Sequence, residues 1–234
     1  MFDVDIVIPV YKEKNNLYKL LNSIENNTII KLRILICYDL GDPDYLDYKL
    51  LIPKYNFKII MIQNLKTGPC EAVKTGFLNH NAKCVIVYPA DDFINYKLFD
   101  EMFKLFEQGY SIVAPSRFID GGSMNGAPFL KNILVRVGNK TLNWFSNIAI
   151  HDSSNGFRLF SSELIKKYSI ESNKGFAYSI ELLVKATIGG YKIIEIPSIW
   201  IEREHGNSNF KLLRWIHKYL YWYFKAIINK WFKL

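Results

Sequence analysis

Long apolar segments and cysteine are both scarce in this sequence. No stretch of about 18 apolar residues is free of charge, so we expect no membrane-spanning helix. The three cysteines, Cys37, Cys70 and Cys84, are far apart and have no Cys or His neighbours at ligand spacing. We therefore expect buried thiols in a reducing compartment, with no metal site among them. The chain opens directly into an apolar run of strand length, so no signal peptide is expected.

Acidic side chains are outnumbered by basic ones. The chain has 30 Lys and Arg against 22 Asp and Glu, a formal net charge of +8. Such an excess favours an anionic partner, such as nucleic acid, a phosphorylated substrate or acidic lipid, or it is an ordinary solvated surface. Half of the 234 residues are hydrophobic and no repeat or low-complexity run occurs. This composition argues against wholesale disorder and predicts one generous domain.

Apolar runs of strand length alternate with helical periodicity in the first half of the chain. The runs lie at residues 5–10, 32–38, 58–63 and 84–88. This alternation predicts an α/β fold with a largely parallel central sheet and helices on both faces. Because such sheets bind ligands at the carboxyl ends of their strands, we expect functional residues directly after these runs.

The pattern changes beyond residue 113. Residues 119–128 are typical of a loop, 130–147 and 176–189 of helices, and 155–160 and 192–196 of short strands.

The last segment, residues 210–234, is aromatic and basic. On a helix, five of its basic residues fall within roughly a third of the circumference, and these are Lys211, Arg214, Lys218, Lys225 and Lys233. This predicts a main domain over residues 1–209, followed by a helix over residues 210–234 that rests on anionic lipid. The alternative is a helix docked on its own domain or on a partner chain.

Polar side chains follow three of the predicted strands. The first is followed by a loop that contains Tyr11 and Glu13. Asp39 follows the second, where it could accept from a base or a ribose hydroxyl, or simply begin a turn. Asp91 and Asp92 follow the fourth, and adjacent carboxylates repel unless a cation or a donor compensates. A divalent metal that bridges a diphosphate would compensate, and the alternative is that Asp92 caps the helix expected near residue 95.

In this order, the segments resemble family 2 glycosyltransferases, which have the GT-A fold. The resemblance is carried by Val7-Ile8-Pro9-Val10-Tyr11, the Asp39 loop, Asn64-x-x-x-Gly68-Pro69 and the Asp91 motif. In the second half, residues 114–122 (APSRFIDGG), 152–158 (DSSNGFR), 175–197 and 203–208 are similar to the dolichol-phosphate mannosyltransferase and polyprenyl-phosphate glycosyltransferase group. No single segment is specific, but the ordered set is.

The resemblance implies a glycosyltransferase that inverts the configuration at the anomeric carbon of the transferred sugar. It also implies Mg²⁺ or Mn²⁺ as cofactor and a GDP- or UDP-linked sugar as donor. It implies donor contacts by Pro9, Tyr11, Glu13, Asp39 and Asp91, metal contacts by Asp91 and Asp92, phosphate contacts by Arg117, Arg136, Arg203 and Ser208, and catalysis by Asp91, Asp92 and Arg117. Arginine suits phosphate because its fork of donors matches the oxygens, although each arginine could instead form an ordinary ion pair.

Some positions depart from the family pattern. The family's metal motif, Asp-x-Asp-x-Gln, is Pro89, Asp91 and Phe93 here, so its first and last ligands are missing. Tyr38 and Leu40 alter the surroundings of Asp39, and Asn209 stands where the family often has Lys.

The acceptor expected from the resemblance is a polyprenyl phosphate at the cytoplasmic face of a membrane. A phosphate monoester is largely dianionic at neutral pH and can attack the anomeric carbon without a strong base. The alternative acceptor is a sugar hydroxyl in surface-polysaccharide assembly, which would need a base such as Asp152, Asp91 or Asp92. A catalytically weakened relative that binds a nucleotide sugar or a partner is a further alternative. Nucleic acid is not expected, because the aromatic residues of the tail are spread around a helix.

Overall fold

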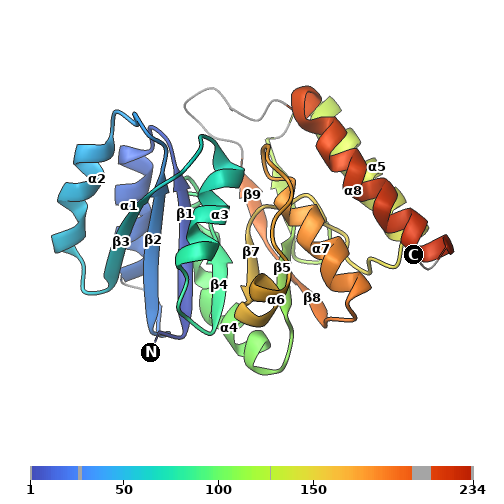
Figure 1. The fold of residues 1–234 in the computed structure, drawn as a ribbon, viewed down its shortest axis with the longest axis horizontal. Helices are drawn as coiled ribbons and strands as arrows, with labels where there is room; N and C mark the ends of the chain where they lie inside the picture. The colour runs from blue at the N-terminus through green and yellow to red at the C-terminus, as the bar shows by residue number, and fades with distance from the viewer. Residues whose placement is uncertain (1, 26–27, 127, 202–211, 233–234) are drawn as a thin grey trace.

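The computed structural model describes residues 2–25, 28–126, 128–201 and 212–232 (Figure 1). A seven-stranded sheet with the order β3-β2-β1-β4-β7-β5-β8 forms its centre. β7 is antiparallel to β4 and β5, and the other pairs in this sheet are parallel. Its strands are β1 (Val4–Val10), β2 (Leu32–Tyr38), β3 (Lys58–Gln63), β4 (Cys84–Val87), β5 (Ile112–Ser116), β7 (Arg158–Ser161) and β8 (Ile193–Pro197). Two further strands, β6 (Ser123–Asn125) and β9 (Ile199–Ile201), pair in parallel as a second sheet.

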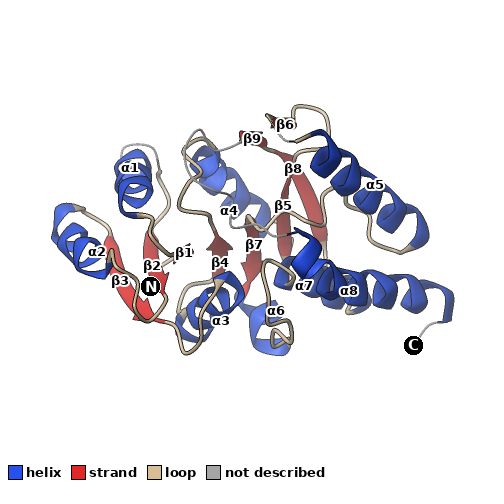
Figure 2. Cartoon of the chain, turned by 90° about the horizontal axis from the view of Figure 1, so that it is seen from above, coloured by secondary structure: helices blue, strands red, loops and turns tan. Residues whose placement is uncertain are grey.

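Helices cover both faces of the sheet (Figure 2). One face packs against α1 (Lys14–Glu25), α2 (Tyr45–Leu51) and α4 (Phe99–Glu107). The other packs against α3 (Pro69–Asn79), α6 (Ser162–Lys167), α7 (Tyr178–Ile188) and α8 (Leu212–Phe232). α5 (Phe129–Phe145) lies beside α8, and short 3₁₀ turns at Ile52–Lys54 and Asn95–Leu98 follow α2 and precede α4. The prediction of an α/β fold with a mainly parallel sheet is confirmed.

Alternating side chains of β1 divide the core into two layers. Ile6 and Ile8 belong to the cluster beneath α1 and α4, whereas Val7 belongs to the cluster beneath α3. α3 lies so close to β1 that a Cβ atom on Gly76 would come within 2.4 Å of the Val7 side chain. Glycine at this position therefore permits the close approach of α3 to the strand.

Parts of the second half differ from the sequence prediction. The run at Ile112–Ser116 forms β5, which the periodicity did not single out, and the segment interpreted as a loop contains β6. Both strands are short, and β6 has a single buried residue, so neither shows a clear two-residue period. The antiparallel direction of β7 also follows from topology and not from its own residues.

The C-terminal helix packs on the rest of the chain. α8 contacts α5 and α7, and its Trp222 and Ala226 are buried in the same cluster as residues of α7. Docking on its own domain, the alternative left open by the sequence, is therefore observed. Among the described residues, no helix is both long and apolar enough to cross a membrane.

Candidate functional site

The loops that carry the predicted site residues meet at one edge of the sheet. β1, β2, β4 and β5 point the same way, so Tyr11, Asp39, Asp91 and Arg117 follow strands that end at this edge. Because β7 runs in the opposite direction, the segment before it brings Asp152 to the same edge. The topology thus assembles residues that are more than a hundred positions apart in the chain.

The loop after β1 is fixed by the loop after β2. Backbone amides of Lys12 and Lys14 donate to the carboxylates of Asp42 and Asp44 at 3.2 and 3.0 Å, and the amide of Glu13 donates to the Tyr48 hydroxyl at 2.9 Å. These bonds hold Lys12 in the left-handed region, at φ 59°, where a residue with a side chain is rarely found.

The predicted donor residues of the first loop are placed in different ways. Pro9 lies inside β1, opposite Cys37 of β2, and Tyr11 is 45% exposed at the strand's end. The Glu13 carboxylate accepts from the Asn16 side chain at 2.6 Å, at the start of α1. The structure therefore brings Tyr11 and Glu13 to the edge on a braced loop.

Asp39 is buried and organises the start of α3. Its carboxylate accepts from the Gly68 amide at 2.9 Å and from the Asn64 side-chain amide at 2.8 Å. The Asn64 amide oxygen is also buried but has no hydrogen-bond partner, so an unused acceptor lies beside Asp39.

A hollow of about 310 Å³ opens beside Asp39. Its lining residues, which come from β2, β3, the start of α2 and the loop between β2 and α2, are Tyr38, Asp39, Leu40, Gly41, Asp42, Tyr45 and Gln63. The rings of Tyr38 and Tyr45 lie 5.0 Å apart between centroids, and burial raises the pKa of Tyr38. The sequence marked Tyr38 only as a departure from the family pattern, whereas the structure makes it part of a hollow with aromatic walls.

Asp92 is a capping residue in this structure. Its Oδ1 accepts from the backbone amides of Ile94 and Asn95 at 3.0 and 2.9 Å, and its Oδ2 accepts from the Asn95 side chain at 2.6 Å. Capping, one of the two roles considered for Asp92, is thus present. Asp91 precedes it and is partly exposed.

A metal ion at this position would have the carboxylates of Asp91 and Asp92 as its nearest protein ligands. Within the described parts of the chain, no group of three or more His, Cys, Asp or Glu side chains is placed to hold one. A magnesium-type site needs fewer protein ligands, since Mg²⁺ commonly uses one or two carboxylates together with substrate phosphates and water. Asp91 fits such a site, with the donor diphosphate as the other main ligand, and Asp92 fits it less well because of its cap.

Arg117 forms a buried ion pair with Asp152. Its Nε and Nη2 donate to the two carboxylate oxygens at 2.6 and 2.8 Å, and Nη2 also donates to the Ser154 hydroxyl at 2.9 Å. The Asp152 side chain is fully buried and that of Arg117 is 10% exposed. Burial by itself would raise the pKa of Asp152, but the Arg117 guanidinium outweighs burial and lowers this pKa below its ordinary value.

Arg136 of α5 comes close to Arg117 through a shared aromatic ring. The guanidinium groups of Arg117 and Arg136 lie 5.2 and 4.7 Å from the centroid of the Phe118 ring. Arg136 also donates to the Asn132 side chain at 2.8 Å and is exposed. Two of the predicted phosphate contacts are therefore brought together, and the sequence did not reveal that Phe118 joins them.

Arg203 and Ser208, the other predicted phosphate contacts, lie outside the described residues.

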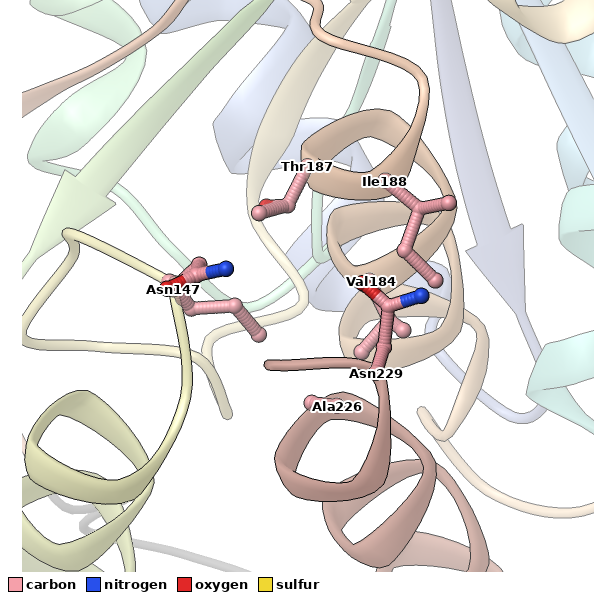
Figure 3. Close-up of a pocket in the computed structure, with 7 residues that line it drawn as sticks. Asn147, Val184, Thr187, Ile188, Ala226 and Asn229 are labelled. Atoms are coloured by element: carbon pink, nitrogen blue, oxygen red, sulfur yellow. The ribbon is translucent and has the colours of Figure 1, made fainter. Parts of the chain in front are cut away.

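A separate small cavity lies between α7, α8 and the segment after α5 (Figure 3). Its volume is about 10 Å³, which is space for roughly one water molecule, so it is a packing feature and not a substrate site.

Together, the mainly parallel sheet and the loops at its carboxyl edge form an α/β fold whose ligand-binding edge carries the candidate site. The chain belongs to the family described as Glycosyl transferase family 2, whose sequence profile matches residues 5–169.

Two curated relatives are similar over most of the chain. Polyprenol monophosphomannose synthase of Mycolicibacterium smegmatis is 24% identical over 211 residues, which cover 87% of this chain and 79% of the relative. Dolichol-phosphate mannosyltransferase of Pyrococcus furiosus is 26% identical over 232 residues, which cover 94% of this chain and 64% of the relative. The chain thus spans about two thirds of the length of the second relative.

Solved structures of glucosyl-3-phosphoglycerate synthase from Mycobacterium tuberculosis share the fold. The complex with phosphoglyceric acid matches with a TM-score of 0.68 at 15% identity, over 97% of this chain and 80% of the other. A complex with Mn²⁺, UDP-glucose and phosphoglyceric acid matches with a TM-score of 0.66 at 14% identity, over 98% and 79%. At this identity the likeness shows the GT-A fold alone.

Proposed function

We propose that the enzyme transfers a sugar from a nucleotide-diphosphate donor to a polyprenyl phosphate at the cytoplasmic face of a membrane. The observation that carries this proposal is the pairing of Arg117 and Arg136 around Phe118, at the edge where Asp39 and Asp91 also lie. Two guanidinium groups on one aromatic ring favour a dianionic acceptor group, because the donors of a guanidinium match phosphate oxygens. The names of both curated relatives refer to a phosphorylated polyprenol or dolichol, which supports the same acceptor class.

The donor would occupy the half of the edge formed by the loops after β1, β2 and β4. Tyr11, Glu13 and Asp39 surround this region, and the unused Asn64 oxygen offers a further acceptor. The solved structures of the synthase that shares this fold contain UDP or UDP-glucose, which supports a nucleotide-sugar donor. A transfer assay with a panel of GDP- and UDP-sugars identifies the base.

In the proposed reaction, an oxygen of the acceptor phosphate forms a bond to the anomeric carbon while the bond from that carbon to the donor diphosphate breaks. The nucleoside diphosphate leaves, and the configuration at the carbon inverts. Mg²⁺ or Mn²⁺, held by Asp91 and the diphosphate, would neutralise negative charge on the leaving group. Arg136 would hold the acceptor phosphate, and Arg117, fixed by Asp152, would add positive charge beside it.

A dianionic phosphate needs no protein base, and this agrees with the state of the nearby carboxylates. Asp152, a candidate base for a hydroxyl acceptor, is fully buried and paired with Arg117. Both oxygens of Asp92 are engaged in its cap. These contacts count against the sugar-hydroxyl alternative, for which Asp91 would be the remaining candidate base.

The test is transfer of labelled sugar from a panel of GDP- and UDP-sugars, with Mg²⁺ or Mn²⁺, into organic-extractable undecaprenyl phosphate. We expect lipid-linked product from one donor, and Arg136→Gln to raise the KM for the acceptor roughly tenfold, because a charge-assisted contact is lost. Lys104→Gln, which removes an exposed cation from α4, is the matched control and should change neither KM nor kcat. Consumption of donor without any labelled lipid would instead favour a saccharide acceptor.

A further inference from the structure

The outward face of α5 is apolar and aromatic. Its exposed apolar residues recur at helical spacing, and they are Phe129, Ile133, Leu134, Val137, Trp144 and Phe145. Trp144 and Val137 are 59% and 55% exposed, whereas Leu142 on the opposite side of the helix is buried against the core. α5 thus presents an apolar stripe to the outside, which is the reverse of the pattern of a surface helix in water.

α8 presents a second stripe of the same kind. The exposed apolar residues over its described side chains are Leu220, Tyr221, Phe224, Ile228, Trp231 and Phe232. At 100° per residue they fall within about a third of the helix circumference. Trp222 and Ala226 lie on the other side and are buried.

The two stripes belong to neighbouring helices. Lys230 of α8 donates to the carbonyl oxygens of Trp144 and Ser146, at 3.1 and 3.2 Å, and so satisfies the C-terminal end of α5. Figures 1 and 2 show α5 and α8 side by side at the end of the molecule that lies opposite α2. The exposed residues of both helices therefore lie at the same end of the molecule.

α8 is held so that its stripe cannot turn inward. The indole Nε1 of Trp222 donates to the Ser172 hydroxyl at 3.0 Å. The ammonium group of Lys185, on α7, lies 5.1 Å from its ring centroid. These contacts fix the rotation of the helix about its axis, so the outward position of Phe224 is a property of the packed structure.

The charges of these helices select the kind of surface that could cover the stripes. Neither α5 nor α8 contains an Asp or a Glu, whereas the basic residues among their described side chains are Arg136, Lys140, Lys225 and Lys230. A second copy of this chain, related by two-fold symmetry, would place like charges opposite one another, which is unfavourable. A membrane surface with anionic headgroups matches both the apolar stripes and the basic charge of these helices. Apolar and aromatic side chains enter the headgroup boundary, while Lys and Arg meet the phosphates.

We propose that α5 and α8 together form the membrane-docking face of the protein, and that α5 is as necessary as α8. This inference extends the proposed function, on which it rests for the lipid nature of the acceptor. Because Arg136 is on α5, docking of this face would hold the Arg117–Phe118–Arg136 group near the headgroups, where the phosphate of a polyprenyl acceptor lies. The C-terminal helix is then one half of a two-helix surface.

The experiment is flotation of the full chain with phosphatidylcholine vesicles that contain or lack phosphatidylglycerol. We expect binding to vesicles with phosphatidylglycerol, weakened by added salt. Trp144→Glu on α5 and Phe224→Glu on α8 should each lower the partition coefficient roughly tenfold, because each replaces an inserted aromatic group with a charge that the lipid repels. Leu50→Glu on α2 and Leu78→Glu on α3 are matched controls, since both leucines are well exposed on helices outside the face, and they should bind as the wild type does.

Each other outcome overturns the inference. If Phe224→Glu lowers binding but Trp144→Glu does not, α8 docks alone. If the wild type is a dimer in light scattering and Trp144→Glu makes it monomeric without changing flotation, a second copy covers the face. Equal melting temperatures for the four variants and the wild type would exclude misfolding as the cause.

Transfer assays separate this inference from the proposed function. With a short-chain polyprenyl phosphate dispersed in detergent, Trp144→Glu should retain the wild-type rate while its transfer to acceptor in vesicles falls. Vesicle binding by a wild type that labels no lipid acceptor would refute the proposed acceptor and leave the docking face standing.

Discussion

The two halves of the candidate site hold their carboxylates in different ways. In the donor half, Asp39, Asp42 and Asp92 accept mainly from backbone amides and side-chain amides of neighbouring loops. In the acceptor half, Asp152 accepts from the guanidinium group of Arg117, and the peptide carbonyl of Asp152 accepts from the fully buried Arg158 at 2.8 Å.

This difference indicates what each half is built to do. Amide donors fix the shape of a loop without adding charge, which suits the placement of a ligand among backbone segments. An ion pair between a guanidinium and a carboxylate sets the position of a charge, and burial makes each partner dependent on the other. Substitutions of Asp by Asn, which keep the shape and remove the charge, should therefore have unequal effects in the two halves.

The largest effect is expected for Asp152→Asn. The substitution leaves Arg117 and Arg158 buried without the carboxylate that compensates them, and breaking a buried pair in this way costs about 3–5 kcal/mol of unfolding free energy. Urea denaturation of the two proteins measures this difference. Adding Arg117→Met to the Asp152→Asn background should recover part of the loss, and a double variant that is less stable than Asp152→Asn would contradict the ion-pair explanation.

The same pair should give a defined pH dependence. The pKa of Asp152 is lower in the folded protein than its ordinary value of 3.8, so the unfolded state binds the proton more readily. Its contribution to stability is therefore complete above the unfolded pKa and is lost as the pH falls through 3.8 toward the folded pKa. The stability difference between wild type and Asp152→Asn should stay constant near neutral pH and shrink in that acidic range.

A smaller effect is expected for Asp39→Asn in the donor half. The amide that replaces one oxygen faces the donors of Gly68 and Asn64, which costs about 1–3 kcal/mol, but no buried charge is left unpaired. The change is measured by urea denaturation, and nucleotide affinity by titration calorimetry with GDP and UDP should fall in parallel. Asp47→Asn, which disturbs only a surface pair with Lys14, should alter neither. A loss as large as that of Asp152→Asn would remove the distinction between the halves.

Much of the fold could be predicted from the sequence because the first half carries strong periodicity. The strands at Leu32–Tyr38 and Lys58–Gln63 have the predicted bounds, since each is a mostly apolar run of strand length. The short strands β5, β6 and β9 could not be found in this way, because their identity depends on partners distant in the chain. The docking of α8 through Trp222 is likewise decided by tertiary contacts with Ser172 and α7.

The site was predictable as a set of positions but not as a set of interactions. Strand ends gave Asp39 and Asp91 their common edge, which follows from the parallel topology of β1, β2 and β4. Arg117 was found through the family resemblance, because the strand that precedes it, β5, was not predicted. That Asp152 would be the partner of Arg117 depends on the direction of β7, and the sequence does not specify this direction. The roles of Asp39, Asp91, Arg117 and Arg136 in binding remain predictions.

The smallest expected effect concerns the strained residue of the donor half. At φ 59°, Lys12 occupies a conformation that glycine adopts freely and other residues adopt at a cost. Lys12→Gly should therefore be more stable than Lys12→Ala by about 1 kcal/mol, although alanine is favoured at most other positions. Both variants lack the Lys side chain, so the comparison isolates the backbone, and urea denaturation of the pair measures it. In an Asp42→Asn background the advantage of glycine should shrink, because the loop, no longer held through the Lys12 amide, can leave the left-handed conformation. An undiminished advantage would mean that Asp42 does not hold this loop, and the amide-based bracing of the donor half would need another source.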